Sequence, residues 1–176
     1  MRRGSVRMLA AVALATALVS CGRPQEPTRF LNFDAESTVG VLVSGWSGFE
    51  KTSEGDTFVW SQARQAKLTV VDRGDGDRIL RFRCWPFRFP GAGPQTATVF
   101  VNGAKIESLV LSDGSRVYTL VTPKAVWKEG PNEVRFDFAY AESPKDRIPG
   151  SIDARTLSAA FDWLEILPPL PAPEKR

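Results

Sequence analysis

The stretch NEVRFDFAYA, residues 132–141, decides the fold because its apolar and polar side chains alternate. Val134, Phe136, Phe138 and Tyr140 share one face, and mostly charged residues occupy the other. Successive side chains of a β-strand point to opposite faces of its sheet, so this period of two predicts a strand with one buried face.

Further strands show the same alternation. In residues 78–84, three apolar side chains, the last of them Cys84, alternate with Arg81 and Arg83. This is again the pattern of a half-buried strand. Other strands are predicted at 67–71, 116–121 and 160–167, and two more between 96 and 111.

The turns between these strands are marked by glycine. Asn102-Gly103 suits a type I′ hairpin, because both positions tolerate positive φ. Gly74-Asp75-Gly76 predicts a similar hairpin between 67–71 and 77–84. No long stretch has the 3.6-residue period of an amphipathic helix, so about eight short strands predict an all-β fold, an antiparallel β-sandwich.

Residues 1–20 have the layout of a secretory signal peptide. Three arginines precede an apolar run from Met8 to Val19, which is shorter than the about 20 residues of a membrane-spanning helix. Leu18-Val19-Ser20-Cys21 resembles the lipobox of bacterial lipoproteins. The resemblance implies cleavage before Cys21 and acylation of Cys21, which anchors the protein to a membrane. An ordinary signal peptide that ends near a cysteine is the alternative.

Proline and charge mark the other boundaries. We predict a lipidated cysteine and Pro-containing linker at 21–29, a β-sandwich domain at 30–167 and a Pro-rich tail at 168–176. The signal peptide takes three of the 23 basic residues and none of the 20 acidic ones, so the mature domain is neutral. A neutral domain gives no electrostatic reason to expect nucleic acid. With Cys21 acylated, Cys84 has no partner for a disulfide within the chain.

Two turns resemble those of the galactose-binding-domain-like jelly roll. They are the Val101-Asn102-Gly103 hairpin and the segment VWKEGPN, residues 126–132, before a late strand. In the second turn Gly130 permits a chain reversal, and Asn132 can bond nearby backbone groups. The resemblance implies a jelly-roll β-sandwich that binds carbohydrate through loops at one edge or on a concave face.

Short motifs across the domain are similar to uncharacterised β-rich modules attached to bacterial membrane glycosyltransferases and to sulfatase-like proteins. This similarity implies an accessory role related to sugars. Ser158 departs from the pattern, because those modules often have glycine there. The motifs are Gly45-Trp46 with Glu50, Trp60-Ser61, Ser143-Pro144 and DARTL at 153–157.

Flat aromatic faces bind sugars, and the chain has five tryptophans. The richest stretch is WPFRFPG, residues 85–91, where two prolines predict a stiff loop outside the sheet. Trp85, Phe87 and Arg88 are therefore ligand-binding candidates, and the alternative is that Trp85 and Phe87 close the end of the sandwich. Three further tryptophans are expected in the core: Trp46, Trp60 and Trp163. Trp46 is also a ligand-binding candidate.

Arginines on the predicted strands have two interpretations. Arg81 and Arg83 could meet a uronate or a sulfate, since guanidinium presents a planar fork to oxyanions. The alternative is a solvated row that pairs across strands with Glu133 or Asp137.

Acidic residues also have competing interpretations. Asp153 and Arg155 could orient a ligand, or hold their long loop by a buried ion pair. Glu50 is a ligand candidate, and with Asp162 it could help to hold a structural calcium, although calcium needs six to eight oxygens and two carboxylates do not support it. A third acidic group has the composition of a hairpin turn: Asp72, Asp75 and Asp77.

The absence of histidine excludes three common kinds of catalytic site. A Ser-His-Asp triad, a Cys-His pair and a His-ligated zinc all need it. Cys84 lies on an apolar face, where an inert thiol is expected. Hydrolysis of glycosides by two carboxylates needs no histidine, but no spacing singles out a pair.

The sequence therefore predicts a lipid-anchored, non-catalytic binding module of the bacterial cell envelope, with carbohydrate as the leading ligand and no cofactor. The alternative is a protein-interaction subunit that docks onto an envelope glycosyltransferase or sulfatase-like partner without binding sugar. Gly22 after Cys21 resembles lipoproteins of the outer membrane, so we predict a location there, facing the periplasm or the cell surface.

Overall fold

The structure is a computed structural model that describes residues 27–34, 36 and 38–168. The predicted signal peptide, Cys21 and most of the predicted linker precede the described residues, and nearly all of the predicted tail follows them. The predictions for those segments therefore lie outside the described residues.

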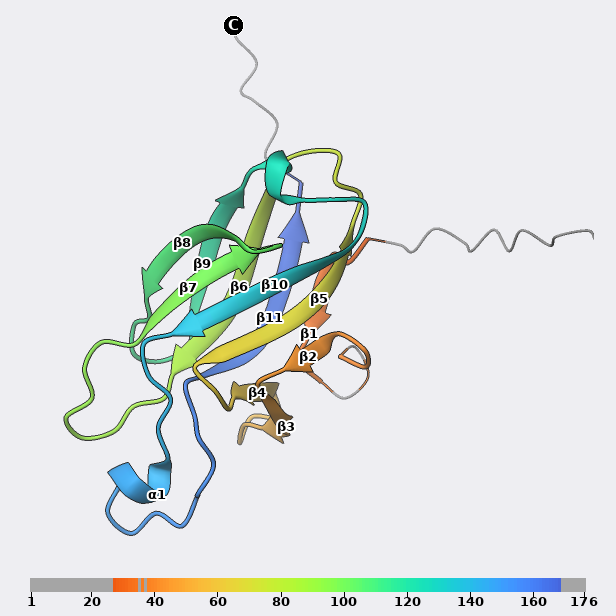
Figure 1. The fold of residues 1–176 in the computed structure, drawn as a ribbon. Helices are drawn as coiled ribbons and strands as arrows, with labels where there is room; N and C mark the ends of the chain where they lie inside the picture. Colours follow the sequence, from red (N-terminus) through yellow and green to blue (C-terminus); the bar gives the residue numbers. More distant parts are fainter. Residues whose placement is uncertain (1–26, 35, 37, 169–176) are drawn as a thin grey trace, which may run out of the picture.

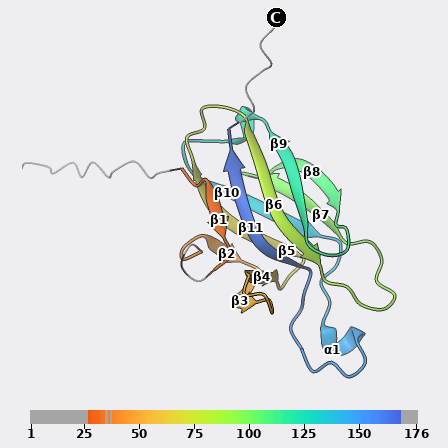
Figure 2. The same ribbon diagram turned by 180° about the vertical axis from the view of Figure 1, so that it is seen from behind.

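The described chain forms two antiparallel sheets that pack as a β-sandwich, which confirms the predicted fold class. Sheet A has the order β3-β4-β11-β6-β9, with β1 also paired to β11, and sheet B has the order β2-β5-β10-β7-β8. Figure 1 shows sheet B in front, and Figure 2 shows sheet A from behind. The strands are β1 (Phe30–Asn32), β2 (Leu42–Ser44), β3 (Trp46–Lys51), β4 (Thr57–Ser61), β5 (Gln65–Asp72), β6 (Arg78–Pro86), β7 (Thr96–Val101), β8 (Ala104–Val110), β9 (Arg116–Thr122), β10 (Gly130–Phe138) and β11 (Ala159–Leu167).

Within residues 27–34, 36 and 38–168, helical structure is confined to two short segments, the 3-10 turn η1 (Lys124–Val126) and α1 (Pro144–Arg147). The helix α1 lies in the long loop between β10 and β11, at the same end of the sandwich as the link between β6 and β7 (Figure 1). Among the described residues, no helix has the length and apolar character needed to span a bilayer.

An aromatic core fills the space between the sheets. Phe136 of sheet B lies with its ring centroid 5.1 Å from Phe82 and 4.8 Å from Phe161, both of sheet A. All three side chains are fully buried. Burial of one phenylalanine contributes about 1.5–3 kcal/mol, so this cluster is a main source of stability.

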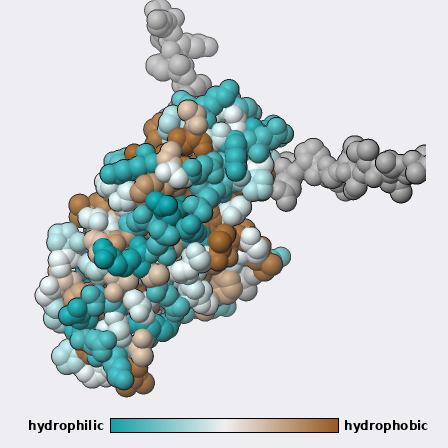
Figure 3. Space-filling view, in the orientation of Figure 1, coloured by the Kyte–Doolittle hydropathy of each residue, from teal (hydrophilic) through white to brown (hydrophobic). Residues whose placement is uncertain are grey.

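The strands that carry the alternation behave as predicted. Along β10 the apolar residues of even number are buried, and Glu133, Arg135 and Asp137 are partly exposed on the outer face of sheet B. Glu133 pairs there with Lys67 of β5, with the Lys67 Nζ atom 3.2 Å from Glu133 Oε2. Figure 3 shows that hydrophilic side chains cover the middle of this face.

The predicted hairpin through Gly74-Asp75-Gly76 is wrong, because β5 belongs to sheet B and β6 to sheet A. A buried ion pair bridges the crossing: Arg78 Nε lies 2.8 Å from Asp72 Oδ2, and Arg78 Nη2 lies 3.0 Å from Asp72 Oδ1. Asp75 also accepts a hydrogen bond from Arg78. The aspartates that have the composition of a turn thus hold a connection between the two sheets.

The Asn102-Gly103 hairpin is confirmed between β7 and β8, with φ values of 49° and 83°. Asn132 bonds the backbone of its turn as predicted, since its Nδ2 atom donates to the carbonyl oxygens of Lys128 at 2.9 Å and Gly130 at 2.8 Å. The Nδ2 atom of Asn102 also donates to Asn132 Oδ1 at 2.7 Å. The two turns that carry the resemblance are therefore joined to each other.

Arg81 and Arg83 point outward as predicted, but their predicted partners are wrong. Arg81 Nη1 lies 2.6 Å from Glu165 Oε1, and Arg83 Nη1 lies 2.9 Å from Asp162 Oδ2. Both acidic residues belong to β11, the neighbour of β6 in sheet A. Glu133 and Asp137 lie in sheet B, on the opposite side of the core.

Candidate functional site

Two surface cavities are candidates for a ligand site. The loop cavity, of about 600 Å³, lies between residues 88–94 and residues 110–113. The sheet A cavity, of about 480 Å³, lies on the outer face of sheet A. Its lining residues come from four places in the sequence: Thr52, Glu54, Asp56, Arg83, Trp85, Gly114, Ser115 and Asp162.

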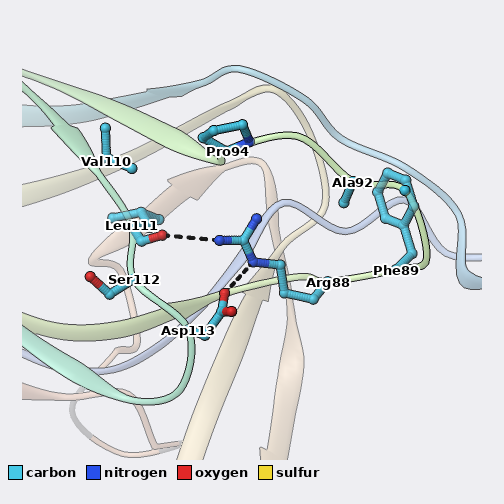
Figure 4. A pocket seen from close by; sticks show the side chains of 9 residues that line it. Arg88, Phe89, Ala92, Pro94, Val110, Leu111, Ser112 and Asp113 are labelled. Carbon is cyan, nitrogen blue, oxygen red and sulfur yellow. Dashed lines mark hydrogen bonds and ion pairs between the residues drawn. The ribbon is translucent and has the colours of Figure 1, made fainter.

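The loop cavity is built around Arg88, which is occupied by contacts within the protein (Figure 4). Its Nε atom lies 2.5 Å from Asp113 Oδ1, and its Nη1 atom donates to the carbonyl oxygen of Gly93 at 2.9 Å. Its Nη2 atom reaches the Leu111 carbonyl oxygen at 3.4 Å. Every nitrogen of Arg88 thus holds the surrounding loops together, so the guanidinium is already committed within the protein.

Asp162 of β11 lies in the sheet A cavity, next to a β-bulge. The register between β11 and β6 shifts between Phe161 and Trp163. Phe161 and Leu164 are both fully buried in the core, so the two residues between them, Asp162 and Trp163, both face outward. Regular alternation from Phe161 already turns Asp162 outward, and the extra residue of the bulge adds Trp163 beside it on the outer face.

The same bulge explains why the predicted core position of Trp163 is wrong. Regular alternation from Phe161 would turn residue 163 inward. Instead Trp163 is partly exposed, with the Arg81 guanidinium 5.8 Å from its ring centroid and the Phe30 ring at 6.0 Å. Its ring is therefore flanked by neighbours of the same protein.

Arg83 forms one polar wall of the sheet A cavity. Besides its ion pair with Asp162, it donates a hydrogen bond from Nε to the Ser115 hydroxyl at 2.7 Å. Ser115 belongs to the link between β8 and β9, so these contacts fix Arg83 between a strand and a loop. A guanidinium fixed at both ends is a preorganised polar group, which is what orients a ligand in a site.

Trp85 forms the aromatic wall, and it belongs to β6 and not to the predicted loop. It pairs with Ala160 of β11, which shows that the predicted loop begins later than expected. The Phe58 ring lies 5.2 Å and the Trp60 ring 6.5 Å from Trp85. These contacts hold the Trp85 ring on the outer face of the sheet, where it is half-buried and lines the cavity.

Trp60 is a second tryptophan whose expected place in the core is wrong. The core cluster contains its neighbour Val59 and not Trp60. Alternation along β4 therefore turns Trp60 to the outer face, where it supports Trp85 and Phe87. This small aromatic layer lies outside sheet A and separate from the main core.

The cavity carries an excess of negative charge. Three carboxylates line it, from Glu54, Asp56 and Asp162, against the single guanidinium of Arg83. Burial raises the pKa of the Asp162 carboxyl, Arg83 acts in the opposite direction, and the nearby Asp56 carboxylate raises this pKa further. A hydrogen bond from the Ser53 hydroxyl lowers the pKa of Glu54.

Trp85 lines the sheet A cavity, and so do Arg83 and Asp162, for which the sequence allowed a uronate or sulfate contact and a calcium ligand. The other ligand-binding candidates lie elsewhere. Phe87 is buried against Trp60, as in the alternative interpretation, and Arg88 lies in the loop cavity. Trp46 packs against core rings, with Phe161 at 5.3 Å, and its indole N–H donates to the Lys67 carbonyl oxygen at 2.6 Å.

Glu50, Asp153 and Arg155 come together in a separate ion-pair cluster. Arg155 Nη1 lies 2.5 Å from Glu50 Oε1, and Arg155 Nη2 lies 2.7 Å from Asp153 Oδ2. The pairs join β3 to the loop that contains α1, which agrees with the loop-holding interpretation. The ion pair is half-exposed rather than buried as predicted, since the Arg155 side chain is 39% exposed.

Several lining residues were missed by sequence reasoning. Thr52, Glu54 and Asp56 lie in the tight turn between β3 and β4, where Thr52 N–H donates to the Asp56 carbonyl oxygen at 2.8 Å. Ser115 lies in another turn. Polar residues in a turn give no signal of their own, because turn chemistry alone explains them.

A calcium site at Glu50 and Asp162 finds no support in the geometry. Glu50 pairs with Arg155, and Asp162 pairs with Arg83. In the described part of the chain, no three acidic or cysteine side chains are placed to hold one metal ion.

Comparison with known proteins gives matches at the level of the fold. No family model and no curated protein matches the sequence. A family 35 carbohydrate-binding module from an environmental isolate matches with a TM-score of 0.52 and 16% identity, over 81% of this chain and 96% of that chain. A CBM35 from Cellvibrio japonicus matches with a TM-score of 0.51 and 16% identity, over 80% of this chain and 94% of that chain. The chain has the jelly-roll fold of these modules. At 16% identity the likeness shows the fold alone. The residues that line the sheet A cavity determine which ligand it can bind.

Proposed function

We propose that this protein is a non-catalytic carbohydrate-binding module and that its ligand binds in the sheet A cavity. The observation that carries the proposal is the half-buried Trp85 ring beside the fixed Arg83–Asp162 pair. A sugar has apolar C–H faces and polar edges, so it fits a site in which an aromatic wall stands beside a few oriented polar groups. The carbohydrate-binding modules that share the fold add support.

Two further features support the choice of this cavity. Ser115 and Thr52 add hydroxyl groups to the lining, and hydroxyls can both donate and accept hydrogen bonds with sugar hydroxyls. The Phe58 and Trp60 rings support Trp85 from the side, so the aromatic wall is rigid before a ligand arrives. Preorganisation of this kind reduces the entropy lost on binding.

The proposal is tested by calorimetric titration with neutral, uronate-bearing, sulfated and amine-bearing oligosaccharides. Saturable binding of at least one class is expected. Trp85→Ala should weaken that binding more than about tenfold, because loss of a central aromatic contact costs about 2 kcal/mol or more. Arg88→Ala is the matched control, since it alters the loop cavity and should leave the affinity unchanged.

Trp85→Ala also removes contacts with Phe58 and Trp60, so its folding must be checked by thermal unfolding. Ser115→Ala is a milder second variant, because it removes one hydroxyl from the cavity wall. If the affinity fell with Arg88→Ala and not with Trp85→Ala or Ser115→Ala, the ligand would bind in the loop cavity. Absence of binding to all four classes would count against the whole proposal.

We also propose that acyl chains on Cys21 hold the module at the bacterial envelope, in the outer membrane. The motif at residues 18–21 and Gly22 support this. Metabolic labelling with an alkyne analogue of palmitate should tag the protein, and Cys21→Ser should abolish the tag and release the protein from membranes. Labelling that survives this substitution would contradict the proposal. The docking subunit stays an alternative prediction.

A further inference from the structure

We propose that the sheet A cavity selects carbohydrate that carries positive charge, that is, amino sugars with a free ammonium group, over neutral and acidic sugars. This inference rests on the proposed function, because it assumes that the cavity binds sugar. It adds the chemical class of the ligand.

The sheet A cavity has negative charge that no described residue neutralises. The Arg83 guanidinium is already committed to Asp162 and to the Ser115 hydroxyl. Glu54 accepts a hydrogen bond from the Ser53 hydroxyl at 2.8 Å, and within the described residues neither Glu54 nor Asp56 forms an ion pair. Two uncompensated carboxylates therefore face the cavity, and a cationic ligand would neutralise them.

Asp162 is enclosed by the protein, in contrast to the exposed Glu54 and Asp56. Its side chain is 10% exposed, although it lines the cavity. Oδ2 contacts Arg83, and in the described part of the chain no hydrogen bond is made to Oδ1. Since Oδ1 is not among the buried side-chain atoms that lack a partner, it is open to the cavity, where it can accept a hydrogen bond from an ammonium group of the ligand.

The aromatic wall of the cavity is formed by Trp85. The Trp85 ring can take the apolar face of a sugar ring, and a tryptophan face also attracts a nearby cation. Aromatic and acidic walls together suit a ligand with an apolar face and a positive edge. A bare metal ion has no apolar face, and the lining carboxylates do not form a metal-binding group in the described residues.

Acidic sugars are repelled by the carboxylates that line the cavity. A uronate would enter a cavity with three carboxylates, and the one guanidinium there is already paired. Like charges brought together in a partly desolvated site cost affinity and exclude the wrong partner. Arg81 and Arg83, the outward arginines of β6, thus do not make a uronate or sulfate site, because β11 supplies an acidic partner to each of them.

The test is calorimetry of the full-length protein at pH 6 with four matched tetramers: β-1,4-linked glucosamine, its N-acetylated form, β-1,4-linked glucose and galacturonate. Glucosamine tetramer should bind at least about tenfold more tightly than the glucose and N-acetyl tetramers, since a hydrogen bond to a charged group adds about that factor. The galacturonate tetramer should bind most weakly, and added salt should reduce the preference.

Two exposed carboxylates allow a variant that should fold normally. The double variant Asp56→Asn, Glu54→Gln should remove most of the preference for glucosamine and retain binding of the neutral tetramers. Asp113→Asn in the loop cavity changes the net charge in the same direction and should leave the preference intact. Trilysine serves as a cation without a sugar ring and should bind much more weakly than the glucosamine tetramer.

The outcomes separate the inference from the proposed function. Binding of a neutral or acidic tetramer as tight as that of the glucosamine tetramer, and lost with Trp85→Ala, would overturn the inference and leave the proposed function standing. Equal binding of trilysine would also overturn it. Absence of glucosamine binding would overturn the inference, and the proposed function would then be judged on the wider panel.

Discussion

The carboxylate of Asp162 and the guanidinium of Arg83 meet at 2.9 Å on the outer face of sheet A, beside a β-bulge at which two consecutive residues of β11, Asp162 and Trp163, both face outward. Without the bulge, the alternation that buries Phe161 would continue through the strand, and Leu164 and Ile166 would leave the core. The bulge therefore keeps Phe161, Leu164 and Ile166 together in the core, and it leaves Trp163 beside Asp162 on the outer face.

The first prediction concerns the protonation of Asp162. Burial raises its pKa and Arg83 lowers it, so Arg83→Met should raise the apparent pKa of Asp162 further above its ordinary value. Carbon-detected NMR of the carboxyl group against pH measures this directly. Arg81→Met is the control, since Arg81 pairs with Glu165 and should leave the Asp162 titration unchanged. An unchanged pKa in Arg83→Met would show that the ion pair has little influence.

The second prediction concerns the buried pair that bridges the two sheets. The side chains of Arg78 and Asp72 are 6% and 1% exposed. Asp72→Ala leaves a buried guanidinium with one partner fewer, so it should lower the free energy of unfolding by about 3–5 kcal/mol in urea titrations. Lys67→Met breaks the half-exposed pair with Glu133 and should cost no more than about 1 kcal/mol. Similar losses in the two variants would contradict this ranking.

The third prediction concerns a close approach of the chain to itself at Gly45. Its φ is +79°, and a Cβ atom at this position would lie 2.2 Å from the Gln65 carbonyl oxygen. Gly45→Ala should therefore cost at least about 2 kcal/mol of stability. Gly48→Ala, three residues further on in β3, is the matched control, because its Cβ would have no neighbour within 4 Å. Equal thermal stability of the two variants would disprove the close approach.

The fourth prediction is a pH dependence from Cys84. Burial raises the pKa of this thiol far above its usual range. Above the pKa of about 8.5 in the unfolded chain, the unfolded thiol loses its proton and the folded thiol keeps it. This contribution to stability is therefore complete below that pH and falls by about 1.4 kcal/mol for each pH unit above it.

Urea unfolding at pH 7, 9 and 10 checks the effect. Cys84→Ala should be less stable than the parent at pH 7, because it leaves a small cavity, and the gap should narrow at pH 9 and 10. Both proteins carry Cys21→Ser, so that Cys84 is their one thiol. A gap that stays constant with pH would mean that the folded thiol ionises normally.

Much of the fold was predictable because local patterns determine it. Alternation in β6 and β10 assigns their faces correctly, and the positive φ that Asn102 and Gly103 tolerate places the β7–β8 hairpin. These features depend on residues adjacent in sequence. Assignment of a strand to a sheet does not, which is why the link through Gly74 was predicted as a hairpin and is a crossing between sheets.

The candidate site was predictable only in part for the same reason. Trp85 stands out as an aromatic residue, but the bulge at Asp162 depends on how β11 pairs with β6 and has no mark in the sequence. The acidic turn between β3 and β4 belongs to strands that were not predicted individually. Its meeting with Trp85 and Ser115 is a property of the sandwich as a whole.

The most direct test of the central claim is NMR observation of the indole N–H signals during titration with the carbohydrate that binds best in the panel. Trp46 and Trp127 are internal references, because their indole groups donate to Lys67 and Thr122 inside the protein, at 2.6 Å and 2.8 Å. A ligand in the sheet A cavity should shift the Trp85 signal and the backbone signals of Asp162 and Ser115, while the two references stay in place. Saturable binding that leaves Trp85 and Asp162 unmoved would contradict the account and place the site elsewhere.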